Sequence, residues 1–414
     1  MERCGATRMH IRSLKRQIIA LSRTAAAGGR SPVAHHPFVI HGALLKILVS
    51  GGGIAGLACA LEFGRRGHDV TVIERAPHLR LTGTPIDIRG DAIEAVEKMG
   101  LLTRIQARRV RMSEQTQFLD IHGEPIARMP IAEIGDSDDD IEILREDLVG
   151  ILADAVSDAA TIRFDDSIKV LAHSDDHVDA QFASGRTARY DLVVGADGQY
   201  SAVRRLVFGP DEHCLRHLGV YFALAHLPDE PHTEGANSIY NVPGRMAGVF
   251  RYGGKTVAVF EFRSESVDYD PDDVDGKKQI LFDAFADYRS WRIPELLEAA
   301  RVDPAFYFSA ASQVHLTSWH RGRVVLVGDA GYCAAFLSGR GTSLALTGAR
   351  FLAEELDRDR DHTTAFARYE ARQRPYVTFA QGRVASGRDR VLPATWADIA
   401  ARNQALKAAS TRIL

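Results

Sequence analysis

Apolar runs and apolar residues at helical spacing alternate along the first part of the folded chain. The run Ala43–Ser50 predicts a buried strand, and Ile54–Arg66 predicts a helix that stops at Gly67. Asp69–Glu74 is a second short apolar run and predicts another strand. A strand, a helix and a strand in this order form a βαβ unit, which predicts the start of a doubly wound parallel sheet.

Farther along, between residues 217 and 262, apolar and polar residues alternate with a period of two. This period predicts strands, and Pro243-Gly244 and Gly253-Gly254 mark turns between them. An antiparallel sheet set into an α/β chain predicts a second lobe. The strands expected here are Gly219–His226, Asn237–Val242, Met246–Arg251 and Thr256–Phe262.

The remaining pattern predicts further helices, two buried strands and a hairpin. Phe118–Met129 resembles a hairpin split at His122-Gly123, and Tyr190–Val194 and Arg323–Val327 resemble buried strands. The helices expected are Asp91–Met99, Arg145–Val156, Lys278–Tyr288, Pro294–Ala300, Ser343–Leu356 and most of the chain from Thr363 onward.

Charge and composition exclude several classes of function. The formal net charge of −3 over 414 residues gives no electrostatic argument for a nucleic-acid or membrane partner. No apolar stretch reaches the roughly 18 residues that a membrane span needs. The four cysteines have neither CxxC nor zinc spacing, so we expect reduced thiols in a cytoplasmic protein and no metal site.

Residues 1–45 differ in composition from the rest. They hold seven Lys and Arg residues beside one acid, Glu2. An Arg-rich, acid-poor segment is typical of a transit peptide, but also of a disordered arm or of a start site placed too far upstream. We expect an extension of one of these kinds.

The first chemical motif is a glycine-rich turn after the first predicted strand. Gly51, Gly53 and Gly56 form GxGxxG, and Ile54 and Ala55 open the helix that follows. The three glycines allow a tight turn, close approach of a pyrophosphate and close helix packing. The pyrophosphate would lie at the helix N-terminus, where free N–H groups and the helix dipole favour negative charge.

An acid at the end of the second predicted strand completes this dinucleotide motif. Glu74, followed by Arg75, stands where a carboxylate can bind ribose hydroxyls. No second GxGxxG follows, so one tightly bound dinucleotide is the simplest interpretation.

A second glycine-rich segment precedes the long predicted helix near residue 343. In Ser338-Gly-Arg-Gly-Thr-Ser343, Gly339 and Gly341 allow close backbone approach, and Thr342 or Ser343 can cap the helix. The dipole of that helix would stabilise negative charge on a group bound at its N-terminus.

Together these segments resemble the group A flavoprotein monooxygenases, the para-hydroxybenzoate hydroxylase fold family. The family's middle motif corresponds to Gly195-Ala-Asp197-Gly198, and its last motif corresponds to Gly328-Asp329-Ala330. Within the family, Gly83–Gly90 and Gly328–Cys333 resemble the tetracycline-inactivating and polyketide-tailoring branch.

The resemblance runs from about Lys46 to about Tyr376 and implies FAD as a tight, non-covalent cofactor. Asp197 and Gly198 would serve FAD and NAD(P)H, Asp329 would contact the ribityl chain, and Arg145 would reach FAD from a helix start. The implied reaction is reduction of the flavin by NADPH or NADH, oxygen addition at its C4a as a hydroperoxide, and hydroxylation of an aromatic or polyketide-like substrate.

The substrate is expected between the flavin and the antiparallel sheet. The pocket candidates are Phe336, Tyr221, Tyr240 and Arg251. The resemblance also implies a glutathione-reductase-type FAD-binding domain with an inserted substrate domain, in a monomer or homodimer. The expected division is 1–45 extension, 46–117, 141–215 and 311–362 FAD-binding, 118–140 and 216–310 substrate-binding, and 363–414 C-terminal helices.

Two departures from the family pattern lie after the last motif. Tyr332 stands where the family usually has His, as in the tetracycline branch, and Ala334 and Phe336 stand at family proline positions. Proline fixes φ and lacks a donor N–H, so its loss weakens the case for efficient hydroxylation more than that for FAD binding.

Two alternatives stay open. One is a flavin-dependent halogenase, because Trp291-Arg-Ile-Pro294 resembles half of the halogenase Trp-x-Trp-x-Ile-Pro motif. Against it, Arg289 replaces the first Trp and no lysine lies between Lys46 and Lys98. The other alternative is an FAD-binding protein without efficient hydroxylation.

Overall fold

The computed structural model describes residues 44–80, 84–110, 116–128, 137, 139–227, 237–270, 273–359 and 361–411. Residues 42–414 form one compact unit. Some expectations concern residues that the structure does not describe. These are the N-terminal extension (all but its last two residues), Gly83 and Met129.

A six-stranded sheet forms the first layer, in the order β18-β19-β12-β1-β2-β8. All its pairings are parallel except that of β18 with β19. Its strands are nearly fully buried where β1, β12 and β19 lie side by side, as continuous apolar runs predict. The strands are β1 (Lys46–Ser50), β2 (Asp69–Ile73), β8 (Thr161–Arg163), β12 (Leu192–Gly195), β18 (His320–Arg321) and β19 (Val324–Leu326).

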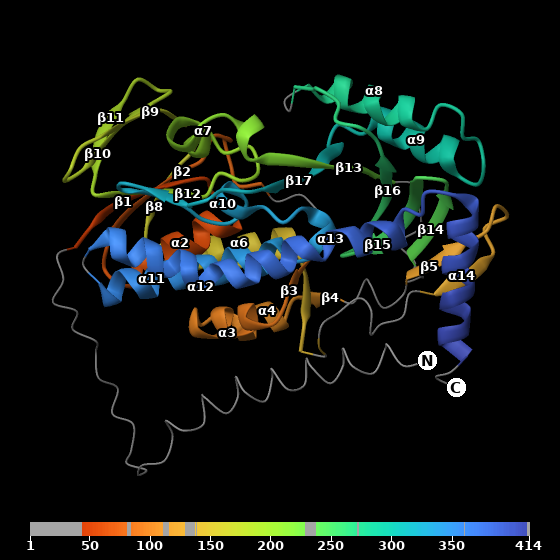
Figure 1. Ribbon diagram of the computed structural model, residues 1–414, viewed down its shortest axis with the longest axis horizontal. Coiled ribbons are helices and arrows are strands. Elements are labelled where there is room, and N and C mark those ends of the chain that lie inside the picture. The colour runs from red at the N-terminus through yellow and green to blue at the C-terminus, as the bar shows by residue number, and fades with distance from the viewer. Residues whose placement is uncertain are drawn as a thin grey trace, which may run out of the picture. The chain divides into compact units, whose positions relative to one another are not determined.

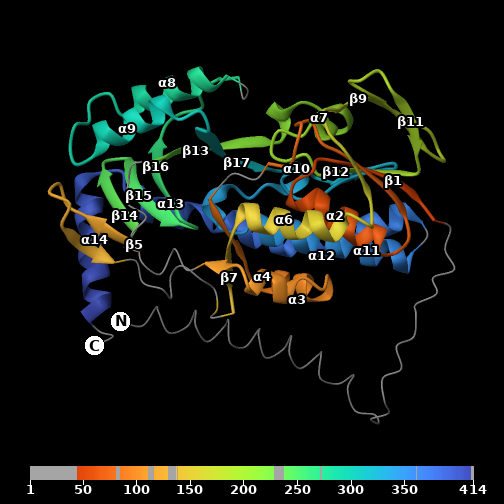
Figure 2. The same ribbon diagram turned by 180° about the vertical axis from the view of Figure 1, so that it is seen from behind.

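Four long helices pack together beside this sheet, as Figures 1 and 2 show from opposite sides. They are α2 (Ile54–Gly64), α6 (Arg145–Val156), α11 (Gly341–Arg358) and α12 (His362–Gly382). Most residues of α2 and α11 are buried. Because both helices begin close to strand ends of the sheet, their N-termini lie on the side where ligands bind in doubly wound folds.

Two small antiparallel sheets flank this layer. One has the order β3-β7-β4 and the other β11-β10-β9. Neither was expected from the sequence. Their strands are β3 (Pro85–Ile88), β4 (Arg109–Val110), β7 (Ile141–Leu144), β9 (Ile168–His173), β10 (Val178–Phe182) and β11 (Thr187–Tyr190), and the short helices nearby are α3 (Asp91–Lys98), α4 (Leu102–Gln106) and α7 (Ala202–Phe208).

A seven-stranded sheet forms the second lobe, in the order β17-β13-β16-β15-β14-β5-β6. Its pairings are antiparallel except that of β14 with β5. Its strands are β5 (Thr116–Leu119), β6 (Pro125–Arg128), β13 (Leu215–His226), β14 (Asn237–Val242), β15 (Arg245–Tyr252), β16 (Lys255–Arg263) and β17 (Tyr307–Val314). The four predicted strands and the hairpin all belong to this sheet, whereas β17 was not expected.

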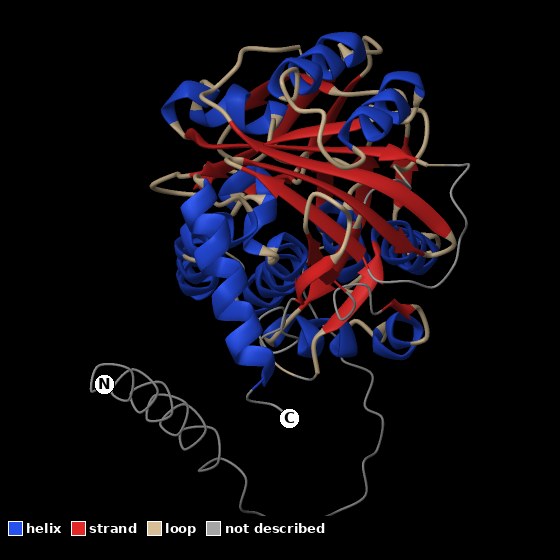
Figure 3. Ribbon diagram, turned by 90° about the vertical axis from the view of Figure 1, so that its right-hand side faces the viewer, coloured by secondary structure: helices blue, strands red, loops and turns tan. Residues whose placement is uncertain are grey.

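Both faces of the seven-stranded sheet are covered. One face packs against α8 (Val274–Ala284) and α9 (Ile293–Val302), and in Figure 3 its strands (red) lie between groups of helices (blue). The other face packs against residues from η3 (Phe336–Ser338), α13 (Val384–Val391) and α14 (Trp396–Thr411). The predicted combination of a doubly wound α/β layer with an inserted antiparallel sheet and C-terminal helices is confirmed.

Candidate functional site

The three motif segments begin at neighbouring strand ends. Ser50 of β1 is paired with Gly195 of β12, and Gly195 is paired with Leu326 of β19. Backbone hydrogen bonds continue this alignment past the strands, from Ala196 N to Ser50 O and from Val327 N to Gly195 O, both 2.9 Å. Parallel strand ends thus bring together motifs that lie far apart in the sequence.

Glycines let the three segments touch. A Cβ on Gly51, whose φ is +105°, would lie 2.6 Å from the carbonyl oxygen of Ala196. A Cβ on Gly56 would lie 1.9 Å from Gly51 O, and one on Gly328 would lie 2.9 Å from the Cβ of Ala55. Any side chain at these positions would force the segments apart.

Gly53 differs from these glycines because it faces open space. A Cβ added there would meet no atom within 4 Å. Gly53 is the N-cap of α2, its φ is −81°, and no side chain caps the helix. The first turn, which begins with Ile54 and Ala55, therefore presents N–H groups and the positive end of the helix dipole to this space, as a pyrophosphate requires.

Glu74 holds the glycine turn from the side. Its Oε2 accepts a hydrogen bond from Gly52 N at 2.7 Å, and its Oε1 accepts one from Ala76 N at 2.9 Å. Each carboxylate oxygen keeps a second lone pair for a ribose hydroxyl. The neighbouring Arg75 is exposed at the same edge.

Asp329 is the first residue of α10 (Asp329–Tyr332) and a second acid near the glycine segments. It is solvent-exposed although protein atoms crowd around it. Desolvation by these surrounding atoms raises the pKa of its carboxyl, while a hydrogen bond from the Cys333 thiol and the charges of Arg145 and Arg204 oppose that rise. An acid held in this way can accept hydrogen bonds from hydroxyl groups of a bound ligand.

Arg145 interacts electrostatically with both acids, Glu74 and Asp329. It is the first residue of α6, it is half-buried, and its Nη1 donates to Arg80 O at 3.0 Å. Burial and the charge of Arg80 lower the pKa of its guanidinium, and the charges of Asp329 and Glu74 oppose that shift. Its charge thus interacts with both Asp329 and Glu74.

The N-terminus of α11 lies beside Asp329. A Cβ on Gly341, the first residue of the helix, would lie 3.9 Å from Asp329 Oδ1. Thr342 is half-buried, and no side chain caps the helix. The expectation that Thr342 or Ser343 caps α11 is wrong, because Ser343 Oγ instead accepts from Arg89 N at 2.9 Å.

The left-handed Gly339 precedes α11, with a φ of +59°. A Cβ on it would lie 3.6 Å from the guanidinium carbon of Arg89. That distance is an ordinary van der Waals contact, so glycine is favoured here for its φ alone.

Asp197 has a structural use inside the protein. Its Oδ1 accepts from Ser201 Oγ, and its Oδ2 accepts from Ala202 N at 2.8 Å and from Val203 N at 3.1 Å, so it caps α7. Burial raises the pKa of this carboxyl. Because three hydrogen bonds hold this carboxylate inside the protein, contact with a cofactor would fall to the backbone of the segment, where Ala196 and Asp197 lie against Gly51.

The substrate-side candidates divide between the two faces of the seven-stranded sheet. Phe336 is partly exposed, and its ring centroid lies 5.5 Å from that of Phe222. Tyr221 is 1% exposed and stacks on Phe262 and Phe308, in the core under α8 and α9.

Tyr240 lies in the same core under α8 and α9, and the alternation of β15 places Arg251 on that face as well. Tyr221, Tyr240 and Arg251 therefore do not face Phe336. Phe222 and Tyr307, which no sequence pattern singled out, do belong to the face of Phe336. Their ring centroids lie 6.0 Å apart.

Tyr332, which stands where the family usually has His, has a packing role. The Tyr332 side chain is buried, its hydroxyl lies 3.0 Å from that of Tyr369, and a Cβ on Gly348 would come within 2.0 Å of it. Tyr332 thus packs α10 against α11 and α12. Ala335, between the two family proline positions, has a φ of +68°, and the structure gives no reason for Ala334 and Phe336 themselves.

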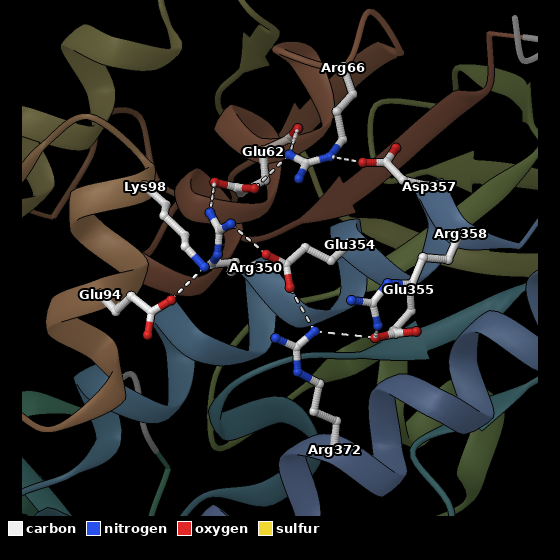
Figure 4. A network of polar contacts seen from close by, with 10 residues as sticks. All are labelled: Glu62, Arg66, Glu94, Lys98, Arg350, Glu354, Glu355, Asp357, Arg358 and Arg372. Atoms are coloured by element: carbon white, nitrogen blue, oxygen red, sulfur yellow. Dashed lines mark hydrogen bonds and ion pairs between the residues drawn. The ribbon is translucent and has the colours of Figure 1, made fainter. Parts of the chain in front are cut away.

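A network of ion pairs fixes α2 against α11 and α12 (Figure 4). Glu62 of α2 is 3% exposed and pairs with Arg66 at 2.6 Å and with Arg350 of α11 at 3.8 Å. Arg350 also pairs with Glu354 at 2.5 Å, and Glu354 with Arg372 of α12 at 2.6 Å. The helices whose N-termini form the site are therefore tied together away from it.

Comparison with known proteins identifies the family. Residues 45–378 match the family described as FAD binding domain. The chain belongs to this family. It is an FAD-dependent monooxygenase, because its relatives bear that name over most of their length.

Relatives of this flavoprotein include proteins named as monooxygenases. A flavin-dependent monooxygenase of Legionella longbeachae is 36% identical over 80% of this chain and 86% of its own length. A protein of Mycobacterium tuberculosis is 38% identical over 80% of this chain and 90% of its own length. The crystal structure of tetracycline destructase Tet(51) is 33% identical, covers 88% of this chain and 95% of its own, and has a TM-score of 0.77.

The described residues of this flavoprotein hold neither a candidate metal cluster nor a candidate membrane-spanning helix. Among them, no cluster of three or more His, Cys, Asp or Glu side chains has an arrangement that could hold a metal ion. Within the same residues, no helix is both long enough and apolar enough to cross a membrane.

Proposed function

We propose that this flavoprotein uses NADPH or NADH and O2 to hydroxylate an aromatic or polyketide-like small molecule. The observation that carries the proposal is the ring contact between Phe336, which follows the Gly328-Asp329 motif, and Phe222 of the seven-stranded sheet. The flavin end of the cofactor site thus continues directly into an aromatic face of the second lobe.

The cofactor would be held along the line of the three motifs. Gly51, Gly53 and Gly56 would take the pyrophosphate at α2, and Glu74 with Arg75 would bind the adenosine side. Asp329 would accept from the ribityl hydroxyls, with Arg145, Asp197 and Gly198 along the same cleft. The site residues beside the flavin ring would be Gly328, Gly339, Gly341 and Thr342.

When bound, FAD supplies the redox and oxygen chemistry. The chain's own residues bind, orient and exclude water. The N-terminus of α11 would stabilise negative charge at the edge of the ring, because its first N–H groups lack a side-chain cap. Phe222, Tyr307 and Phe336 would cover an aromatic substrate and keep water from the reacting atoms.

The similarity to tetracycline destructase Tet(51) supports a polycyclic substrate class. The halogenase alternative gains no support from the position of Trp291. Its ring packs on Tyr240, with centroids 5.7 Å apart, on the sheet face covered by α8 and α9.

Product analysis under isotopically labelled O2 tests this proposal. The purified holoenzyme is given NADPH, or NADH in a parallel series, and either tetracycline or one of a panel of simple phenols. We expect at least one compound to stimulate NAD(P)H oxidation and to gain one labelled oxygen atom. Peroxide as the sole product with every compound would contradict hydroxylation and favour the FAD-binding alternative, and a chlorinated product would favour the halogenase.

A further inference from the structure

Glu261 is a buried acid on the flavin-side face of the seven-stranded sheet. It belongs to β16, where Val257 and Val259 point to the same face, toward η3 and the C-terminal helices. In register, Glu261 is paired with Phe222 of β13 on one side and with Met246 of β15 on the other. It therefore lies next to the Phe222–Phe336 contact.

The Glu261 carboxyl lacks a partner there. The residue is 9% exposed, and its buried Oε2 has no hydrogen-bond partner within the described part of the chain. Burial alone raises the pKa of this acid to about 7. A buried polar group without a partner destabilises a fold, so an acid at this position calls for a ligand or another function.

Nearby cations are engaged elsewhere. Arg263, two residues along the same face, donates to Leu392 O and to Asp389 Oδ1, both at 2.8 Å. Arg245 of β15 lies over the Tyr288 ring on the opposite face. Arg402 of α14 donates to Asn241 Oδ1 at 2.9 Å and lies over the Phe118 ring.

Two arginines in and just before α13 also interact with other groups. Arg388 donates to Asp389 at 3.0 Å, and Arg383 lies over the Phe379 ring. Among the described residues, none of these cations forms an ion pair with Glu261.

We propose that Glu261 is the specificity-determining residue of the substrate pocket, and that it binds a basic nitrogen carried by an aromatic substrate. This inference rests on the proposed function, because it needs the substrate to lie over Phe222 and Phe336. An ammonium group would supply both the hydrogen-bond donor and the counter-charge that the buried carboxylate lacks. A neutral hydroxyl group would supply only the donor.

The test uses a matched pair of probes on the FAD-loaded protein. The probes are 2-naphthylmethylamine and 2-naphthylmethanol, which differ in charge but hardly in shape. Binding is followed by the change in the visible absorption of the bound flavin. At about pH 8, the wild-type protein should bind the amine at least about tenfold more tightly than the alcohol.

Variants separate a binding role from a structural one. Glu261→Gln should weaken amine binding by about tenfold or more and change alcohol binding less than about twofold. Glu298→Gln, an exposed acid on α9, should leave both unchanged. If the wild-type protein has no preference for the amine, or does not respond to it, the inference is wrong, and it is equally wrong if Glu261→Gln keeps the preference.

A pH series on the wild-type protein covers the case in which Glu261→Gln does not fold. Amine affinity should fall by about tenfold between pH 8 and pH 6, because the carboxyl becomes protonated while the amine stays charged. A flat profile would contradict the inference. A protein that carries no FAD would instead overturn the proposed function, whereas hydroxylation of neutral aromatics without amine preference would overturn only the role of Glu261.

Discussion

Gly328 and Ala55 bring the last flavin motif against the first, since a Cβ on Gly328 would lie only 2.9 Å from the Cβ of Ala55. Gly328 also has a φ of +66°. Gly328→Ala should therefore destabilise the protein by about 1–3 kcal/mol and weaken FAD binding by at least about tenfold. Urea unfolding and fluorescence titration with FAD measure the two effects.

Gly150→Ala is the matched control for that variant. Gly150 lies inside α6, and a Cβ there meets no atom within 4 Å. Alanine favours a helix over glycine by about 1 kcal/mol, so this variant should be as stable as the wild type or more stable, with unchanged FAD affinity. Equal effects of the two substitutions would refute the packing argument for Gly328.

The buried Glu261 predicts a stability that depends on pH. Its pKa rises from an ordinary 4.5 to about 7 on folding, so the folded protein holds this proton more tightly. The favourable contribution is present below pH 4.5 and is lost as the pH rises through 7. Relative to Glu261→Gln, the wild type should lose on the order of 3 kcal/mol across that window. Urea unfolding of both proteins at several pH values measures this, and a difference that does not vary with pH would contradict it.

The ion-pair network of Figure 4 should contribute to stability through its buried member. Glu62→Gln removes the charge that Arg66 and Arg350 share, and we expect a loss of about 2 kcal/mol together with weaker FAD binding. Glu94→Gln is the control, because its pair with Lys98 is exposed and should contribute less than about 0.5 kcal/mol. Thermal unfolding of both variants measures these losses. Equal losses would mean that the network has no role in holding α2 against α11.

Adjacent residues of β13 should have separate roles. Phe222→Leu should raise the KM for a stimulating substrate by about threefold or more and leave stability nearly unchanged. Tyr221→Phe should leave KM unchanged and cost about 1 kcal/mol, because it removes the hydrogen bond from Val267 N, 2.8 Å long. A KM effect confined to Tyr221→Phe would mean that the substrate lies on the other face.

Much of the architecture follows from local sequence patterns. The bounds of several elements follow from the sequence within a few residues. The signals are the GxGxxG turn, the apolar runs of β1 and β12 and the two-residue period of β14 to β16. The faces of β13 could not be assigned in this way. Val220 to Leu224 form an unbroken buried or half-buried run, because protein covers both sides of the sheet.

Three other features could not be predicted from periodic patterns. β17 was missed because Ser309 to Ser312 are small residues without alternation. Glu261 had a usable signal, since it is a single acid at an inward-facing position of an apolar strand. The engagement of Asp197 with the start of α7 depends on three-dimensional contacts that no spacing reveals.

Gly53 provides the most direct test of the flavin site. Its φ of −81° suits alanine and a Cβ there touches no protein atom, so Gly53→Ala should fold like the wild type. The measurement is FAD bound per chain after reconstitution and gel filtration, for wild type, Gly53→Ala and Gly150→Ala. We predict close to one FAD for wild type and Gly150→Ala, and at least about tenfold weaker binding for Gly53→Ala. A wild-type chain that binds no FAD, or a Gly53→Ala variant that binds it as tightly as the wild type, would contradict this account of the site.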